Sequence, residues 1–283
     1  MNPEPRHFSD YGQRETTAAH RVLVDLGQVL GGFMDCIVLV GGWVPDVLLE
    51  GAEEPHVGSI DVDLALDIGK LLGGRYAKLL KLLLDTGRYV QGDEKFKFVT
   101  DVDLKDGLKP VRVEVDFLAS AKVRAKKGAQ KLMPGFRVLQ ADGCDAAFRE
   151  PRLVVISGQM ASGAKNSVEF RVASLPDFLV MKAYALKKRD KPKDAYDICY
   201  CLTHLGTDLP ALARDWKDRE ADPDVRKAIG FIDEKFAKVD SFGPRQVVEF
   251  HDSSDPEERA MQARRAFELV RHFLNLVRAP QSS

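Results

Sequence analysis

The sequence lacks several features that would assign it to a familiar class of protein. No run of apolar residues is long enough to span a bilayer, and the first residues do not follow the basic-then-apolar order of a signal peptide. Cysteine is scarce, no two cysteines form a Cys-x-x-Cys pair, and the six histidines are scattered, which argues against a structural zinc site. We therefore expect a cytoplasmic protein with no membrane contact. Free, mostly buried thiols are expected at Cys36, Cys144, Cys199 and Cys201.

An excess of charge of one sign is also missing. The chain has 283 residues, and 42 basic residues face 43 acidic ones, so the whole molecule is not an evident nucleic-acid binder. A local basic stretch, Lys122–Lys131, contains no acid and could still contact an RNA backbone, although such runs more often form solvated loops. With 45% hydrophobic residues and no internal repeat, the chain can bury one large core or two smaller ones.

What is present is an ordered series of short motifs in the first half of the chain. The apolar run Cys36–Val40 predicts a buried strand that stops at Gly41-Gly42. A short helix is expected over Trp43–Glu50, followed by a polar loop with a glycine at each end. A second strand is then expected over Ser59–Leu66.

This second strand carries two carboxylates on one face. Apolar and polar residues alternate along it, so Asp61 and Asp63 project from the same side as Ser59. Two neighbouring carboxylates repel each other, and stability alone would not favour that arrangement. A divalent cation that bridges to the phosphates of a nucleotide removes the repulsion. The motif therefore predicts a metal and phosphate site.

A later strand offers a third carboxylate. A strand over Phe96–Leu104 and a turn lead to Val111–Leu118, whose valines share one face and leave Glu114 and Asp116 on the other. We favour Asp116 as the third acid and keep Glu114 as the alternative. Asp101-Val102-Asp103 has the same spacing as the first pair but follows no glycine pair, so we interpret it as a solvated strand end.

The remaining pattern divides the chain near residue 174. Strands over Leu153–Ser157 and Val168–Val172 precede this point, and unbroken helical spacing follows it, beginning at Leu175-Pro176-Asp177. We expect an α/β protein in which residues 1–173 form a mixed-sheet core and residues 174–283 form an α-helical domain. Further helices are expected over Tyr11–Met34, Leu71–Thr86 (closed by Gly87), Leu175–Ala185, Asp194–Leu205, Ala211–Phe236 and Pro256–Arg278.

The order of strand, double glycine, helix, loop and acidic strand resembles the nucleotidyltransferase superfold of DNA polymerase β. The helical half extends the likeness: Lys182, the basic group Lys187-Lys188-Arg189 and the segment Lys193–Ile198 look like the lysine and aspartate motifs of AbiEii-type nucleotidyltransferases. Those proteins are the toxin halves of some bacterial toxin–antitoxin pairs. The resemblance covers roughly residues 36 to 205 and is carried mainly by the glycines and aspartates.

The resemblance implies a set of roles. Asp61 and Asp63 would hold two Mg²⁺ ions, and Asp116 would complete one site and act as base toward an acceptor hydroxyl. The nucleotide-binding residues would be Gly41, Gly42, Ser59, Lys182 and Asp194, with a nucleoside triphosphate such as ATP as substrate. Two of these residues have structural alternatives, because Lys182 could be an exposed helical lysine and Asp194 a helix N-terminal cap.

Two departures leave the acceptor open. Trp43 follows the glycines where AbiEii-type enzymes usually have a small hydroxyl residue, and Gly-Gly-Trp is similar to the aminoglycoside and lincosamide nucleotidyltransferases. The arginine often found before the acidic strand is replaced by His56-Val57-Gly58-Ser59, and we assign no role to His56.

Three hypotheses follow from these patterns. The first is nucleotidyl transfer to an RNA such as tRNA, a protein or a small molecule, with an antitoxin partner if the chain is a toxin. The second is modification of an antibiotic, and the third is a non-catalytic protein that binds nucleotides or a partner.

Overall fold

The chain divides into two compact units. The computed structural model describes residues 4–122 and 137–280. Tyr11–Val47 and Gly58–Ser174 form one unit, here called the sheet unit, whereas Met1–Asp10, Leu48–Val57 and Leu175–Ser283 form the other, here called the helical unit. A mixed sheet followed by a helical C-terminal half is the predicted fold class, and the structure confirms it.

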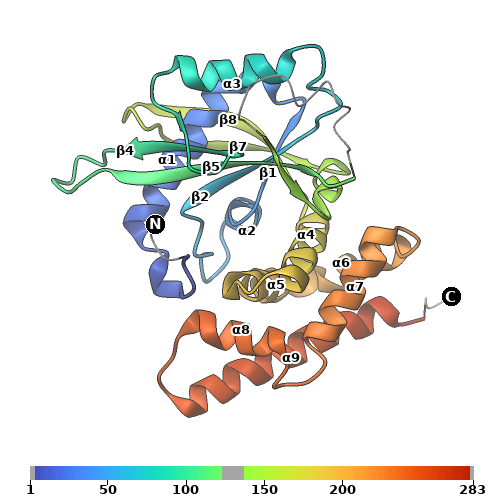
Figure 1. Ribbon diagram of the computed structural model, residues 1–283. Helices are drawn as coiled ribbons and strands as arrows, with labels where there is room; N and C mark the ends of the chain where they lie inside the picture. Colours follow the sequence, from blue (N-terminus) through green and yellow to red (C-terminus); the bar gives the residue numbers. More distant parts are fainter. Residues whose placement is uncertain (1–3, 123–136, 281–283) are drawn as a thin grey trace. The chain divides into compact units, whose positions relative to one another are not determined.

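The sheet unit is built on one sheet, in which eight strands are found within the described residues (Figure 1). The order is β3-β4-β5-β2-β1-β8-β7, and β6 pairs with β5 outside this path. Pairing is parallel for β2 with β5 and for β1 with β8, and antiparallel for β1 with β2. The strands are β1 (Ile37–Val40), β2 (Asp61–Leu66), β3 (Val90–Gln91), β4 (Lys97–Val102), β5 (Val111–Ser120), β6 (Leu139–Ala141), β7 (Arg152–Gln159) and β8 (Lys165–Val172).

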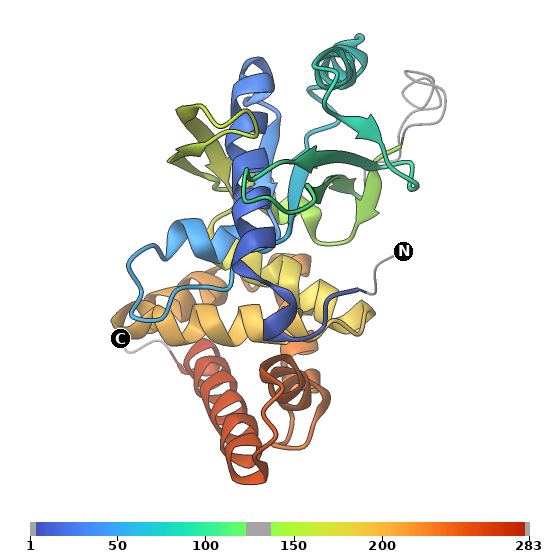
Figure 2. The same ribbon diagram turned by 90° about the vertical axis from the view of Figure 1, so that its left-hand side faces the viewer.

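Helix α1 (Gln13–Val29) covers the apolar face of the sheet and runs along it (Figure 2). The approach is close, because a Cβ atom added at Gly27 would come within 2.6 Å of the Val168 Cβ atom. The same face receives the valines of β5, which alternate with more exposed residues as the sequence predicts. Helix α1 therefore packs on one face of the sheet, and the acidic residues of β2 and β5 project from the opposite face.

Shorter helices complete the sheet unit. Helix α3 (Arg75–Asp85) ends before Gly87, whose φ of +68° is the left-handed conformation predicted for that position. The six-residue helix α2 (Trp43–Leu48) follows directly on the glycine pair. Two 3₁₀ helices, η2 (Gly31–Phe33) and η4 (Cys144–Phe148), connect strands and helices in this unit. The sequence pattern missed β3 and β6, which have two and three residues and are too short for a readable alternation.

The helical unit contains six α-helices within the described residues. The predicted helix over 211–236 is wrong as a single element, because the chain breaks before Pro223 and Asp222 caps the second helix by accepting a hydrogen bond from the Asp224 N–H at 2.8 Å. Helix α8 was not predicted. The helices are α4 (Leu175–Lys188), α5 (Pro192–His204), α6 (Leu209–Asp218), α7 (Pro223–Lys235), α8 (Phe242–His251) and α9 (Pro256–Arg278), with short 3₁₀ turns η1 (Phe8–Asp10) and η5 (Gly206–Asp208).

Two sequence expectations about the whole chain can be compared with the structure. All four cysteines are buried and free, as predicted. Among the described residues, no helix combines the length and apolar character that crossing a membrane requires.

Candidate active site

The acidic residues lie on two neighbouring strands of the sheet unit. Strands β2 and β5 are parallel, and their register pairs Asp61 with Glu114 and Asp63 with Asp116. Paired residues on adjacent strands project from the same face of a sheet, with the strands about 4.8 Å apart. The structure therefore brings Asp61, Asp63 and Asp116 onto one face, as the sequence hypothesis requires, and Glu114 onto the same face.

Gly41 lies against this acidic face. Its φ is +72°, a conformation that side chains rarely adopt, and a Cβ atom at this position would overlap the Asp63 carboxylate. Glycine is therefore required at position 41 by both the backbone and the neighbouring acid. Gly42 follows, and α2 begins at Trp43, so the glycine pair forms the turn between β1 and α2.

The start of β2 is braced by two side chains. The Ser59 hydroxyl, in a residue that is 4% exposed, donates a hydrogen bond to Asp61 Oδ1 at 2.5 Å. The indole N–H of Trp43 donates to the Asp61 backbone carbonyl at 2.8 Å, and Trp43 is only 3% exposed. Trp43 is thus a packing residue that holds the acidic strand, which accounts for its presence after the glycines.

The pKa of Asp116 is strongly perturbed. Burial, followed by the charge of Asp63, raises the pKa of Asp116 from 3.8 to about 8, although Lys97 opposes the shift. Its Oδ1 atom is buried and has no hydrogen-bond partner among the described residues. A buried carboxylate oxygen without a partner destabilises the protein unless a proton or a cation satisfies it.

Glu114 has a different environment from Asp116. Its side chain is 47% exposed and lies 2.5 Å from the ammonium of Lys97, on the adjoining strand β4. Lys97 also lies 3.1 Å from Glu94. Glu114 is therefore paired with a cation, whereas the Oδ1 atom of Asp116 has no hydrogen-bond partner among the described residues, and Asp116 stays the predicted third acid. Lys97 was missed by the sequence reading, since the strand pattern does not show which residue of β5 it faces.

The donor set fits a hard divalent cation. Across residues 4–122 and 137–280, no three or more His, Cys, Asp and Glu side chains are arranged so that they could hold a metal ion as they stand. Three carboxylates on one face nevertheless supply the oxygen ligands that Mg²⁺ takes in proteins. The partnerless oxygen of Asp116 and the carboxylate repulsion that raises its pKa are both conditions that a bound cation would relieve.

The second Asp-x-Asp motif has none of these features. Asp101 lies on β4 with an exposed side chain, and Asp103 follows the strand and pairs with Lys105 at 2.7 Å. The interpretation of this motif as a solvated strand end is confirmed. The pair therefore provides an internal control with the same spacing and no acidic neighbour on an adjoining strand.

Lys182 lies in a buried charge cluster of the helical unit. Its ammonium lies 2.8 Å from Asp194 Oδ1 and 2.6 Å from Asp197 Oδ2, and its side chain is 9% exposed. Arg189 donates to both oxygens of Asp194, at 2.7 and 2.9 Å, and Lys193 lies 2.8 Å from Asp197. The alternative that Lys182 is an exposed helical lysine is wrong, because its charge is needed inside the cluster.

The cluster also changes the interpretation of Asp194. The residue that precedes α5 in the N-cap position is Lys191, and the Asp194 side chain makes buried ion pairs, so the alternative of a helix cap is wrong. Burial alone would raise the pKa of Asp194, but Lys182 and Arg189 outweigh it and hold the pKa at about 2. For Asp197, burial is outweighed in the same way by Lys182 and Lys193, and its pKa lies well below the ordinary value.

His56 is a second residue that sequence reasoning missed. Its side chain is fully buried in the helical unit, and Nε2 lies 2.9 Å from Asp197 Oδ1. Burial, and then the charge of Lys193, lowers the pKa of His56 to about 4, so the ring is neutral near pH 7. No motif surrounds this histidine, and only its position against α5 reveals the contact.

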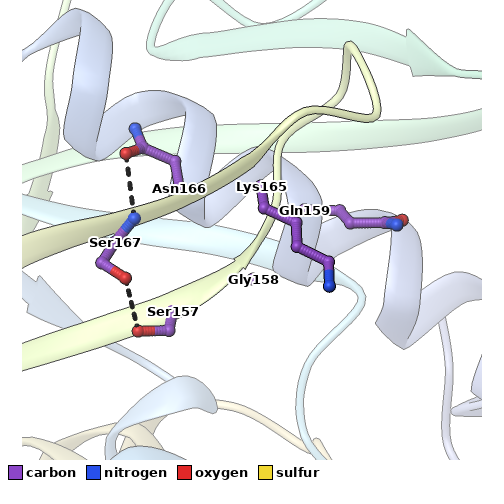
Figure 3. A pocket seen from close by; sticks show the side chains of 6 residues that line it. All are labelled: Ser157, Gly158, Gln159, Lys165, Asn166 and Ser167. Atoms are coloured by element: carbon purple, nitrogen blue, oxygen red, sulfur yellow. Dashed lines mark hydrogen bonds between the residues drawn. The ribbon is translucent and has the colours of Figure 1, made fainter.

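Two other polar regions lie outside the acidic strands in the sequence. A pocket of about 360 Å³ lies at the turn end of the β7–β8 hairpin, where Ser157 and Ser167 share a hydrogen bond of 2.8 Å and the Ser167 N–H donates to Asn166 (Figure 3). It contains no acidic residue, so it does not add to the chemistry of the carboxylates. Of the basic stretch Lys122–Lys131, only Lys122 lies within the described residues, 3.4 Å from Asp145; Arg124, Lys126, Lys127 and Lys131 lie outside them.

The match to a family model agrees with the predicted class. A family model described as "Nucleotidyl transferase AbiEii toxin, Type IV TA system" matches residues 30–280. An antigenic nucleotidyltransferase-like protein from Paracoccidioides brasiliensis is 16% identical, with a TM-score of 0.39, over 76% of this chain and 94% of that chain. JHP933 from Helicobacter pylori is 14% identical, with a TM-score of 0.42, over 93% of this chain and 94% of that chain. No curated protein sequence matches the chain.

Proposed function

The chain belongs to the AbiEii nucleotidyltransferase family, and from this premise we propose that it is a magnesium-dependent nucleotidyltransferase. It would transfer a nucleoside monophosphate from a triphosphate such as ATP to an acceptor hydroxyl. The observation that supports this proposal is the placement of Asp61, Asp63 and Asp116 on one face of parallel strands, with Gly41 in contact with Asp63.

The proposed reaction gives each of these groups a task. The acceptor oxygen forms a bond to the α-phosphorus, the bond from that phosphorus to the bridging oxygen breaks, and pyrophosphate leaves with the electron pair. Asp61 and Asp63 would hold both Mg²⁺ ions, whose chemistry when bound is to offset the negative charge of the phosphate oxygens. Asp116 would contribute to one ion site and accept the proton of the acceptor hydroxyl, because bound cations would relieve the repulsion that raises the pKa of Asp116 in the metal-free protein.

Neighbouring residues would position the acids and the phosphates. Ser59 orients Asp61 through its hydrogen bond, and we propose that the same hydroxyl lies beside the phosphates. Gly41 and Gly42 carry no side chains, so their backbone N–H groups would be accessible to the triphosphate.

Lys182 and Asp194 are proposed to belong to the nucleotide site through the buried cluster. Three cations, Lys182, Lys193 and Arg189, face two carboxylates there, so these five side chains carry a surplus positive charge. A surplus of this sign favours an anionic ligand.

The acceptor and the biological role extend the same proposal. The family description supports a toxin of a toxin–antitoxin pair, and we propose this role, with an antitoxin as protein partner. An RNA such as tRNA, a protein and a small molecule all offer hydroxyl acceptors. The Gly-Gly-Trp motif is weak support for antibiotic modification, because Trp43 is buried in the sheet unit and its contacts there are those of a packing residue.

The test compares variants of the two Asp-x-Asp motifs, at positions 61/63 and 101/103. Purified protein is incubated with each labelled triphosphate, Mg²⁺, and either total RNA, cell lysate protein or an antibiotic panel, and label transfer is measured. We expect transfer by the wild type and by Asp101→Ala/Asp103→Ala, and none by Asp61→Ala/Asp63→Ala. Equal labelling by both double variants would refute the proposal.

Expression of the same three proteins in cells tests the toxin role. Growth arrest by the wild type and by the 101/103 variant, but not by the 61/63 variant, is the expected outcome. Normal growth of cells that express an enzyme active in vitro would refute the toxin role and leave the chemistry in place.

A further inference from the structure

The loop between α2 and the acidic strand is anchored to the helical unit. Residues Leu48–Val57 cluster with the helices, although the chain on both sides of them belongs to the sheet unit. The loop ends four residues before Asp61, the first residue of β2. Only a short stretch of chain therefore joins this loop to the acidic strand.

His56 is the main anchor of the loop. Its Nε2 lies 2.9 Å from Asp197 on α5, and both side chains are fully buried. The ring stacks on Tyr196 with centroids 5.4 Å apart and meets Tyr200 edge-on at 4.7 Å. Because the ring is neutral near pH 7, the geometry fits an Nε2–H group that donates to the Asp197 carboxylate.

The residues on either side of His56 are held to the same helix. The Tyr200 hydroxyl donates to the Glu54 backbone carbonyl at 2.7 Å, and a backbone hydrogen bond joins Val57 to the Tyr196 side chain. The chain then continues into Gly58 and Ser59, both buried in the sheet unit, where Ser59 bonds Asp61. A short, continuous stretch of chain therefore joins the anchored loop to the acid.

Asp197 connects this anchor to Lys182. The carboxylate that receives His56 on Oδ1 also lies 2.6 Å from the Lys182 ammonium through Oδ2. One buried acid thus holds both the loop that leads to Asp61 and the lysine assigned to the nucleotide. The remaining contact to Lys193 keeps this acid compensated when the histidine is changed.

We propose that His56 is a positioning residue for nucleotidyl transfer, which orders the loop that leads into the acidic strand through its hydrogen bond to Asp197. This inference rests on the proposed function. His56 touches neither the phosphates nor the acceptor in this scheme. Its loss would leave the start of the acidic strand less ordered and lower kcat more than it raises KM for the triphosphate.

Three substitutions separate the hydrogen bond from the packing of the ring. His56→Phe keeps the aromatic contacts and loses the hydrogen bond, His56→Gln restores an N–H donor, and His56→Ala loses both. His204→Phe is the matched control, because the His204 ring also contacts the Tyr200 ring, with centroids 4.2 Å apart, but His204 belongs to α5 and not to the loop. Each purified variant is measured for kcat, KM for the triphosphate, thermal unfolding, and hydrogen exchange of the backbone amides of residues 58–66.

We expect His56→Phe to lower kcat roughly 10- to 100-fold with KM changed by no more than about threefold. Exchange in residues 58–66 should rise in the same variant. His56→Gln should recover most of kcat, and His204→Phe should match the wild type in both measurements. Wild-type kcat and exchange in His56→Phe would overturn the inference, as would a loss in His56→Gln equal to that in His56→Phe. Reduced thermal stability with unchanged kcat would also overturn it, because His56 would then be only structural.

The two readouts distinguish this inference from the proposed function. Absence of turnover by the wild type would refute the proposed function, whereas raised exchange in His56→Phe would still support the anchoring of the acidic strand. Normal exchange in that variant would refute the anchoring whether or not the wild type is active.

Discussion

Replacement of Asp116 by Asn is expected to stabilise the metal-free protein at pH 8. Burial and the charge of Asp63 raise the pKa of Asp116 from 3.8 to about 8, so the folded protein holds this proton more tightly than the unfolded chain does. Stability is therefore lost as the pH rises from about 4 through about 8, because folding then opposes an ionisation that the unfolded chain permits. Asparagine is neutral throughout this range and removes the penalty.

The size of the effect follows from the same shift. A carboxyl whose pKa moves from 3.8 to about 8 implies an upper bound of about 5 kcal/mol at pH 8. Asp116 is only partly shielded from solvent, and solvent screening reduces the expected gain to about 1–3 kcal/mol. The gain should disappear near pH 4, where Asp116 is protonated in both states. It should also shrink when Mg²⁺ is added, since the cation stabilises the wild type alone.

Urea unfolding between pH 4 and pH 8.5, with EDTA and then with excess Mg²⁺, measures these differences in the free energy of unfolding. Asp101→Asn is the control, because that side chain lies exposed on β4 and should produce no pH-dependent difference. A variant at position 116 that is less stable than the wild type at pH 8 in EDTA would refute the reasoning. A gain of equal size at pH 4 and pH 8 would also refute it, because the cause would then lie outside the ionisation.

Three further predictions concern single residues of the two units. Gly41→Ala should lower the free energy of unfolding by about 1–3 kcal/mol more than Gly73→Ala does in urea titrations. Both glycines have positive φ, but only a side chain at position 41 would meet a carboxylate. Equal losses in the two variants would contradict the contact with Asp63. In labelling assays, Glu114→Gln should keep the rate of nucleotidyl transfer within about threefold of the wild-type rate, whereas Asp116→Asn should abolish transfer. The reverse result would make Glu114 the third acid. Lys182→Met should destabilise the protein by about 3–5 kcal/mol, because it removes one cation shared by two buried carboxylates. The control Lys187→Met breaks an exposed pair with Glu234 and should change thermal unfolding little. Similar melting temperatures of both variants would count against the cluster.

Several parts of the candidate site could be predicted from the sequence because they depend on local geometry. The alternation over Ser59–Leu66 places Asp61 and Asp63 on one side of any strand that they form, and the positive φ of Gly41 reflects the sharp turn that a glycine pair permits. The break before Pro223 was equally local but was overlooked, although Asp222 followed by proline is a helix-start signal.

The sequence by itself determined which side chains share a face, because the periods of strands and helices are properties of the backbone. It thereby identified the acidic strand, the glycine turn and the class of chemistry. Only the tertiary structure decided which residues meet across elements: Lys97 pairs with Glu114, Asp116 Oδ1 has no hydrogen-bond partner among the described residues, and His56 and Lys182 converge on Asp197. These contacts join residues that are distant in the chain. In the buried cluster they also compensate charges whose burial would otherwise destabilise the protein. Strand register and burial therefore decide them, and neither can be read from local spacing.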